Sequence, residues 1–84
     1  MFTQFTVSGA SLKLLRVGER GTIARITDEN SSIAQQLRRM GLYPGTSITL
    51  EERFPRFVVR THQGTVALSQ PMIQSIYVRN PVSI

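Results

Sequence analysis

The stretch SSIAQQLRRMGLYPG, residues 31–45, combines a short amphipathic helix, a helix stop signal and a tight turn in direct succession. Ile33, Leu37 and Met40 have the i, i+4, i+7 spacing of one helix face, and the glutamines and arginines between them fall on the other faces. This spacing predicts a helix over about 32–41 with one buried side. The rest of the chain is expected to form strands around it.

The start of this helix offers three candidate capping residues. Asn30, Ser31 and Ser32 each carry a side-chain oxygen that can accept a hydrogen bond from the first turn. Ser32 and Gln35 also have the spacing of a capping box. The sequence leaves open which of the three residues caps the helix.

The end of the helix is marked by Gly41, because glycine readily takes the left-handed conformation that closes a helix. Leu37 and Leu42 then occupy the two positions whose contact accompanies a Schellman cap. Pro44 and Gly45 follow at the central positions of an expected type II turn. We therefore expect the helix to end at Gly41 or one residue earlier, and the chain to turn into a strand.

The other apolar segments are short and rich in β-branched residues, which favours strands. Strands are predicted over 22–26, 57–61, 65–68 and 76–78. A further strand begins at residue 47, with Ile48, Leu50 and Phe54 on its core face, and Glu52 is expected to twist or end it. Together these segments predict about five strands.

Turn residues connect these strands. Gly64 is expected to close a tight hairpin between 57–61 and 65–68, and Pro71 lies early in a helical turn predicted over about 69–75. The leucines and valine of the segment 11–17 are expected to face the core. Because no crossover helices alternate with the strands, the pattern predicts a mainly β fold, a small antiparallel barrel rather than a layered α/β sheet.

The composition limits the chain to one small domain, residues 1–84, with residues 1–10 as an N-terminal extension. That extension could be an added strand, a lid or a self-association segment. There is no cysteine, so the stability must come from packing, and no apolar run approaches the length of a spanning helix or of a signal peptide. We expect a cytoplasmic protein.

The net charge is +5, and nine of the ten cationic residues are arginines. Such an excess of positive charge implies an acidic partner, which could be a nucleic acid, an anionic lipid surface or an acidic protein face. The cations are scattered along the chain, and the longest run is the pair Arg38 and Arg39. A disordered basic tail is therefore excluded.

Catalysis has little support in the sequence. His62 is the single histidine, and the neighbouring carboxylates Glu51 and Glu52 lie on a predicted strand, where adjacent side chains point to opposite faces. The glycines Gly18 and Gly21 lack the lysine and hydroxyl residues of a phosphate-binding loop. We expect no enzyme activity, no cofactor and no metal site within the chain, and we interpret His62 as a surface residue of a hairpin turn.

The order of glycines and apolar residues resembles the FeoA family, small cytosolic proteins of bacterial ferrous iron uptake. The resemblance runs from about residue 12 to residue 78 and is sharpest in LRRMGLYPG at 37–45. Its matching positions are Leu15, Gly18, Gly21, Ile23, Ile26, the stretch 37–45, Ile48, Leu50, Pro55, Gly64, Val66, Ala67, Leu68, Ile76 and Val78.

This resemblance implies an SH3-like β-barrel with a helix inserted between its first two strands, a fold that iron-dependent repressors use as a C-terminal domain. It also implies a partner, the membrane transporter FeoB with its cytosolic GTPase domain. The loop after Pro55 is shorter here than in many family members, and residues 1–10 lie outside the resemblance. Contacts that the family makes through those two segments are not carried over.

Five residues are candidates for partner binding: Gln35, Arg38, Arg39, Tyr43 and Arg56. For the arginine pair the alternative is compensation of the helix dipole, and for Tyr43 it is packing with an exposed hydroxyl. Phe54, Arg56 and Phe57 surround Pro55 like a peptide-binding surface, unless both phenylalanines are core.

The leading hypothesis is a non-enzymatic accessory protein that docks on the cytosolic, GTPase-containing part of a FeoB-type transporter. Two alternatives stay open. One is a small basic barrel that binds nucleic acid, because arginine and aromatic side chains can hold phosphates and stack bases. The other is a free-standing regulatory domain related to that of metal-dependent repressors.

Overall fold

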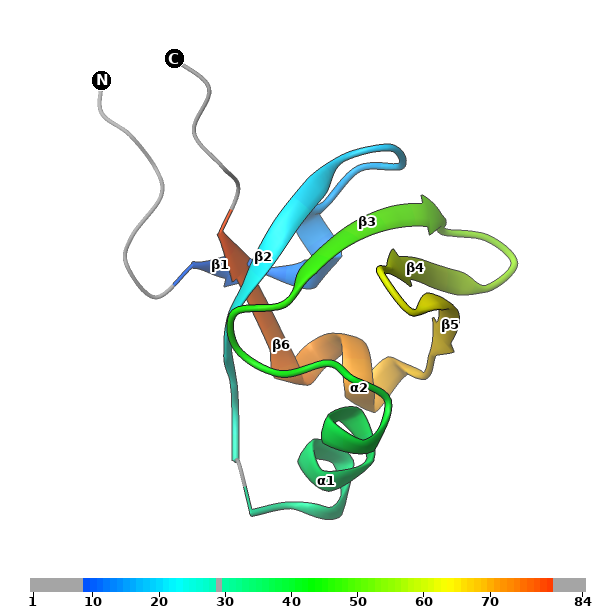
Figure 1. Cartoon of the computed structure of the whole chain (residues 1–84). Helices are drawn as coiled ribbons and strands as arrows, with labels where there is room; N and C mark the ends of the chain where they lie inside the picture. The colour runs from blue at the N-terminus through cyan, green and yellow to red at the C-terminus, as the bar shows by residue number, and fades with distance from the viewer. Residues whose placement is uncertain (1–8, 29, 80–84) are drawn as a thin grey trace, which may run out of the picture.

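The computed structural model describes residues 9–28 and 30–79. These residues form six strands, two α-helices and one 3-10 helix (Figure 1). In chain order they are β1 (Ala10–Ser11), η1 (Leu12–Leu14), β2 (Arg20–Ile26), α1 (Ser32–Arg39), β3 (Ser47–Glu52), β4 (Phe57–Thr61), β5 (Gly64–Leu68), α2 (Gln70–Ser75) and β6 (Ile76–Arg79).

The strands form one antiparallel sheet in the order β1-β6-β2-β3-β4-β5. The sheet curls in the manner of an SH3-like fold, with α1 inserted between β2 and β3, but β1 and β5 stay at its two edges and do not pair with each other. The mainly β, SH3-like prediction is therefore confirmed, and the barrel is an open one.

Strand β1 is the sixth strand, which the sequence pattern did not assign. Its two residues pair with β6, Ala10 opposite Val78 and Ser11 opposite Tyr77. Gly9 precedes it at φ +83°, and a Cβ there would lie 2.6 Å from the carbonyl oxygen of Val78. One end of the segment 1–10 thus joins the sheet, and its residues 1–8 lie outside the described part of the chain.

The predicted hairpin is confirmed. Strands β4 and β5 pair without a register shift from Phe57 opposite Leu68 to Thr61 opposite Gly64, so that His62 and Gln63 form the turn. The register of two other pairs is irregular. It shifts between residues 23 and 25 where β2 meets β6, and between residues 50 and 52 where β3 meets β4.

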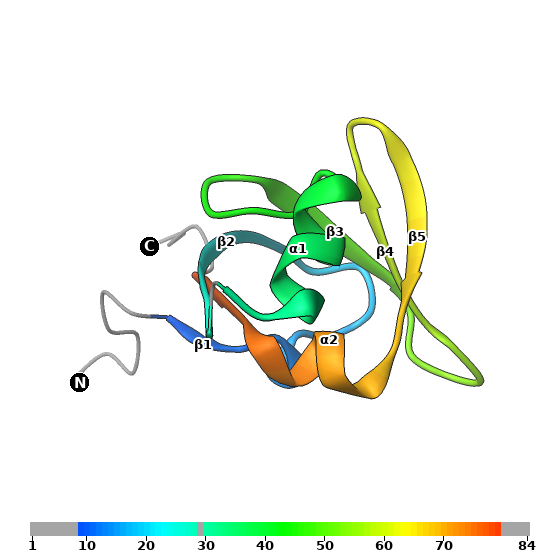
Figure 2. The same cartoon turned by 90° about the horizontal axis from the view of Figure 1, so that it is seen from below.

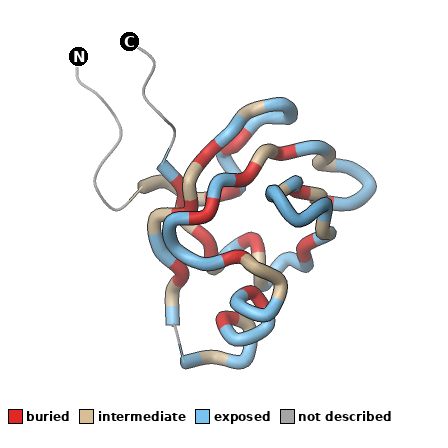
Figure 3. The backbone as a smooth tube through the Cα atoms, in the orientation of Figure 1, coloured by how far each residue is buried: buried red, intermediate tan, exposed pale blue. Residues whose placement is uncertain are grey.

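The core lies between the curled sheet and the two helices. Helices α1 and α2 contact each other and lie below the sheet in the view of Figure 1. Buried positions alternate with less buried ones along β3 and along β2 up to Ile23, and Figure 3 shows this alternation. The side chains with less than 2% exposure are Leu12, Ile23, Leu37, Leu42, Ile48, Leu50, Val59 and Ile76.

Two expectations about apolar residues before β2 are wrong. Leu14 is 71% exposed and Val17 is 58% exposed, whereas Leu12 and Leu15 are buried. The cause is η1, because a 3-10 helix has three residues per turn and places positions i and i+3 on the same side. Leu12 and Leu15 therefore share the inner side, and Leu14 points outward.

The expected core position of Phe54 is also wrong, because this side chain is 84% exposed. Strand β3 ends at Glu52, after the register shift against β4, so the alternation that starts at Ile48 does not continue to Phe54. The Phe54–Pro55 peptide bond is cis. Phe57, the first residue of β4, is buried, so of the two phenylalanines it alone belongs to the core.

Candidate partner-binding surface

Helix α1 presents its polar residues to solvent because its apolar residues face the core. Ser31 is the capping residue, and its Oγ accepts a hydrogen bond from the Ala34 backbone N–H at 3.1 Å. Leu37 and Ala34 are buried, while Ile33 and Met40 are partly buried and pack against the core. The predicted stripe is confirmed, and Ala34 is a core residue that the sequence pattern did not single out.

The end of α1 is a Schellman cap. Gly41 lies at φ +84°, the Leu42 N–H donates to the carbonyl oxygen of Leu37 at 2.8 Å, and the Gly41 N–H donates to that of Arg38 at 3.0 Å. Leu37 and Leu42 are both fully buried. The helix therefore cannot be extended past Gly41, and the chain is directed back to the sheet.

The turn after α1 is fixed to the sheet by backbone hydrogen bonds. The Thr46 N–H donates to the Tyr43 carbonyl oxygen at 3.0 Å, and Gly45 lies at φ +98°, as a type II turn requires. The Gly45 N–H donates to the Ile23 carbonyl oxygen at 2.8 Å, and the Ile23 N–H donates to that of Thr46 at 2.9 Å. Tyr43, which is 45% exposed, is thereby held on a rigid loop.

The structure brings two of the predicted residues together around Pro44. Arg38 and Pro44 line one small hollow, and Tyr43 and Pro44 line a second one. Gln35 and Arg39 are exposed on the same helix as Arg38. We call these four residues, Gln35, Arg38, Arg39 and Tyr43, the helix surface.

The helix surface carries two cations that form no ion pair with any other residue the structure describes. Neither Arg38 nor Arg39 forms an ion pair within the described residues, whereas Arg60 of β4 contacts Glu51 at 2.7 Å. Both arginines lie in the last turn of α1, where a cation is favourable next to the partial negative charge of the helix end. Arg38 and Arg39 therefore stabilise the end of α1, and their exposed guanidinium groups can also contact an acidic partner.

The tip of the β4–β5 hairpin lies beside this surface. His62 lines the same hollow as Tyr43, and a Cβ placed on Gly41 would lie 2.9 Å from the Oε1 atom of Gln63. Figure 2 shows the tip next to the end of α1. Sequence reasoning did not include these two hairpin residues, because no local pattern reports a contact between segments about twenty positions apart.

Arg56 lies outside the helix surface. It lines a groove of about 680 Å³, and no residue of α1 or of the turn after it lines this groove. Figure 2 shows the connection between β3 and β4, which contains Arg56, at the opposite end of the β4–β5 hairpin from its tip. The five candidate residues therefore belong to two separate surfaces.

The side chains of the helix surface are hydrogen-bond donors and acceptors. Within residues 9–28 and 30–79, no three His, Cys, Asp or Glu side chains are grouped so that they could hold a metal ion. No helix in the same part of the chain is long and apolar enough to cross a membrane. The surface offers guanidinium, amide and phenol groups, which can bind carboxylates, phosphates or backbone carbonyls.

Comparison with known proteins agrees with this fold. A protein of Leptolyngbya boryana named "Putative Fe(2+) transport protein A" is 46% identical over 78 residues, which cover 92% of this chain and 95% of the relative. The solution structure of a FeoA-like protein from Clostridium acetobutylicum superposes with a TM-score of 0.79, covers 92% of both chains and is 20% identical.

A third similarity is to part of a larger protein. A manganese-dependent transcriptional repressor matches 84% of this chain with a TM-score of 0.75 and 26% identity, but the match spans only 41% of the repressor. The sequence model of the FeoA domain matches residues 10–80, from β1 to just past β6. The chain therefore belongs to the FeoA domain family.

Proposed function

We propose that this protein is a non-enzymatic cytoplasmic accessory of ferrous iron uptake that docks on the cytosolic, GTPase-containing part of a FeoB-type transporter. The FeoA family membership and the name of the 46% identical relative support a role in Fe(2+) transport. The transporter is the acidic partner in this proposal, and the helix surface is the contact.

The observation that carries the docking proposal is the network of caps and backbone hydrogen bonds that supports the helix surface. A side-chain cap at Ser31, a Schellman cap at Gly41 and a hydrogen-bonded turn hold α1 and Tyr43 in one conformation. A surface that is ordered before binding loses less conformational entropy when a partner docks. Its exposed Arg38 and Arg39 can donate hydrogen bonds to carboxylates of the partner without rearrangement of the core.

The test is a titration of the chain against the purified cytosolic domain of its cognate transporter. The variant Arg38→Glu/Arg39→Glu should bind at least about tenfold more weakly, because two favourable charge contacts become repulsive. Both side chains are exposed, so the fold should be kept, but two anions at the end of α1 oppose its dipole and the melting temperature should fall by a few degrees. The titration is therefore run well below the melting temperature of the variant. Unchanged affinity would remove the two arginines from the interface.

The matched control is Arg16→Glu/Arg20→Glu. It changes the net charge by the same amount, and both residues are exposed, Arg16 in the loop before β2 and Arg20 as the first residue of β2. This end of β2 lies far from α1 in Figure 1. The control should retain wild-type affinity. An equal loss in both double variants would show that net charge alone governs binding, and the helix surface would then not be the contact.

The similarity to a metal-dependent repressor favours a second candidate, a free-standing regulatory domain. A nucleic-acid-binding barrel is the rival, because arginine and aromatic side chains can hold phosphates and stack bases. The scattering of the cations along the chain counts against it. A titration with duplex and single-stranded oligonucleotides separates nucleic-acid binding from docking on a transporter. Binding that is tight and falls steeply with salt would favour nucleic acid.

A further inference from the structure

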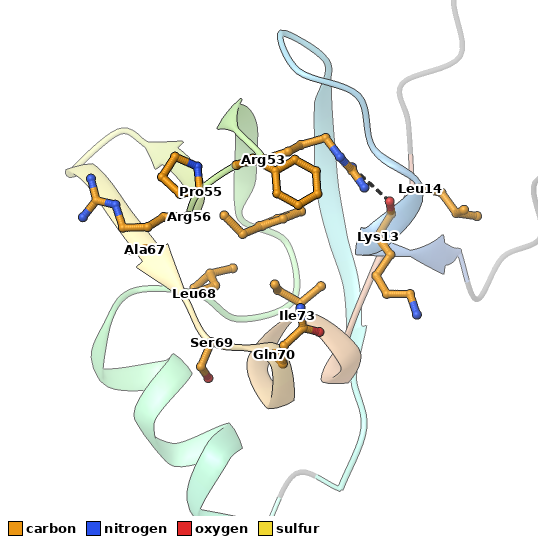
Figure 4. Close-up of a pocket in the computed structure, with 12 residues that line it drawn as sticks. Lys13, Leu14, Arg53, Pro55, Arg56, Ala67, Leu68, Ser69, Gln70 and Ile73 are labelled. Atoms are coloured by element: carbon orange, nitrogen blue, oxygen red, sulfur yellow. Dashed lines mark hydrogen bonds between the residues drawn. The ribbon is translucent and has the colours of Figure 1, made fainter.

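The groove that contains Arg56 has an apolar floor. It lies between the β3–β4 connection, the end of β5, α2 and η1, and we call it the lower groove (Figure 4). Three side chains that belong to the buried core reach its surface, Phe57, Leu68 and Ile73. Its volume of about 680 Å³ is in the range of sites that hold several side chains of a ligand.

The rim of the lower groove is cationic. Lys13, Arg53 and Arg56 line it, and no aspartate or glutamate does so among the described residues. None of the three cations forms an ion pair within that part of the chain. The lower groove therefore combines an apolar floor with positive charge that no neighbouring carboxylate neutralises.

One wall of the lower groove is held in place by Arg53. Its guanidinium donates to the carbonyl oxygens of Lys13 at 3.1 Å and Leu15 at 2.7 Å, and it lies 5.6 Å from the centre of the Phe57 ring. Figure 4 shows this side chain reaching from the β3 side to η1. These carbonyls are neutral, so the arginine braces the wall and keeps its charge.

Exposed apolar side chains gather at the same place. Of the four large apolar residues exposed in the described part of the chain, two line the lower groove, Phe54 and Leu14. Phe54 is the most exposed of the four. Concentration of exposed apolar area next to a groove marks an interaction site, whereas apolar residues scattered singly do not.

The position of β5 indicates which class of molecule fits. It is an edge strand, and its residues 64–68 contain no proline, no charge and no register shift, the features that protect natural edges from pairing. Ala67 and Leu68, at its C-terminal end, line the lower groove. An extended polypeptide can pair with this edge while it places side chains in the groove, and neither a lipid nor a nucleic acid can do so.

We propose that the lower groove binds an extended acidic segment of a partner protein. A large apolar side chain of the segment packs on Phe57, Leu68 and Ile73, and its carboxylates lie at Lys13, Arg53 and Arg56. This site shares no lining residue with the helix surface, so the chain has two separate docking surfaces.

The probe is a synthetic six-residue peptide with a central Phe-Leu pair flanked by two aspartates on each side and labelled with fluorescein. Fluorescence anisotropy should show saturable binding to the full chain. Two control peptides, one with lysines for the aspartates and one with serines for the apolar pair, should each bind at least about tenfold more weakly, because each lacks one half of the complementarity.

Variants locate the site. Arg56→Glu should weaken binding of the acidic peptide about tenfold, and Phe54→Ala by about threefold or more. Both side chains are exposed, so the fold should be kept, and thermal melts check this. The matched controls lie outside both surfaces: Arg20→Glu changes the charge equally and Val17→Ala removes an exposed apolar side chain, and both should bind like the wild type.

Three results would overturn the proposal. The first is an acidic peptide that binds no better than the serine control. The second is an equal loss in Arg56→Glu and Arg20→Glu, which would reduce the effect to net charge. The third is stronger binding, through Arg56 and Phe54, of single-stranded DNA or of vesicles with anionic lipid. Backbone amide shifts in NMR at Ala67, Leu68 and Ile73 on peptide addition would support it.

Discussion

Replacing Gly41 with valine is expected to destabilise the protein by about 2–3 kcal/mol. The backbone at this position has φ +84°, where an L-residue costs roughly 1–2 kcal/mol and a β-branched one more. The new Cβ would also lie 2.9 Å from Gln63 Oε1, which is the far end of a flexible side chain and can move aside. The backbone conformation therefore dominates the loss.

The assay is thermal unfolding followed by circular dichroism, with alanine and asparagine at the same position for comparison. For a domain of this size each kcal/mol lowers the melting temperature by about 4–8 °C, so valine should lower it by about 10–20 °C. Asparagine tolerates the left-handed conformation and should be mildest, with alanine intermediate. Equal melting temperatures for the valine and asparagine variants would refute the role given to the cap.

Three further changes test the packing and the charges. Leu37→Ala removes a fully buried side chain and should lower the unfolding free energy in urea by about 2–5 kcal/mol; a loss under about 1 kcal/mol would contradict its place in the core. Arg53→Met breaks the bonds to two carbonyl oxygens and should lower it by about 1–3 kcal/mol, whereas a neutral change would remove Arg53 as a brace. Arg60→Ala breaks only the solvent-exposed contact with Glu51, so the melting temperature should fall by less than about 5 °C, and a larger drop would assign that pair a structural role.

Local signals in the sequence predicted the elements that local interactions determine. Gly41 predicted the end of α1, and the Leu37–Leu42 spacing predicted its cap, because both depend on residues within one turn. Gly64 predicted the β4–β5 hairpin for the same reason. The choice of Ser31 among three candidate caps needed the structure, since all three residues can chemically accept the bond.

Features that depend on register or on distant segments escaped sequence reasoning. Phe54 continues an apolar alternation in the sequence, yet β3 ends at Glu52 and leaves the phenylalanine exposed. Pairing of Ala10 with Val78 joins the two ends of the described chain. Strand β1 has only two residues, which is too short for an alternation of apolar and polar side chains. The sequence places Arg56 beside Phe54 and Phe57 around Pro55, but only the three-dimensional arrangement shows that residues of η1, β5 and α2 complete that groove.

The central claim is that the helix surface docks on a ferrous iron transporter. The most direct measurement is isothermal titration of the wild-type chain into the purified cytosolic, GTPase-containing domain of the cognate transporter at physiological ionic strength. We expect saturable binding that is lost in Arg38→Glu/Arg39→Glu and kept in Arg16→Glu/Arg20→Glu. No detectable binding of the wild-type chain, by heat or by co-elution, would contradict it.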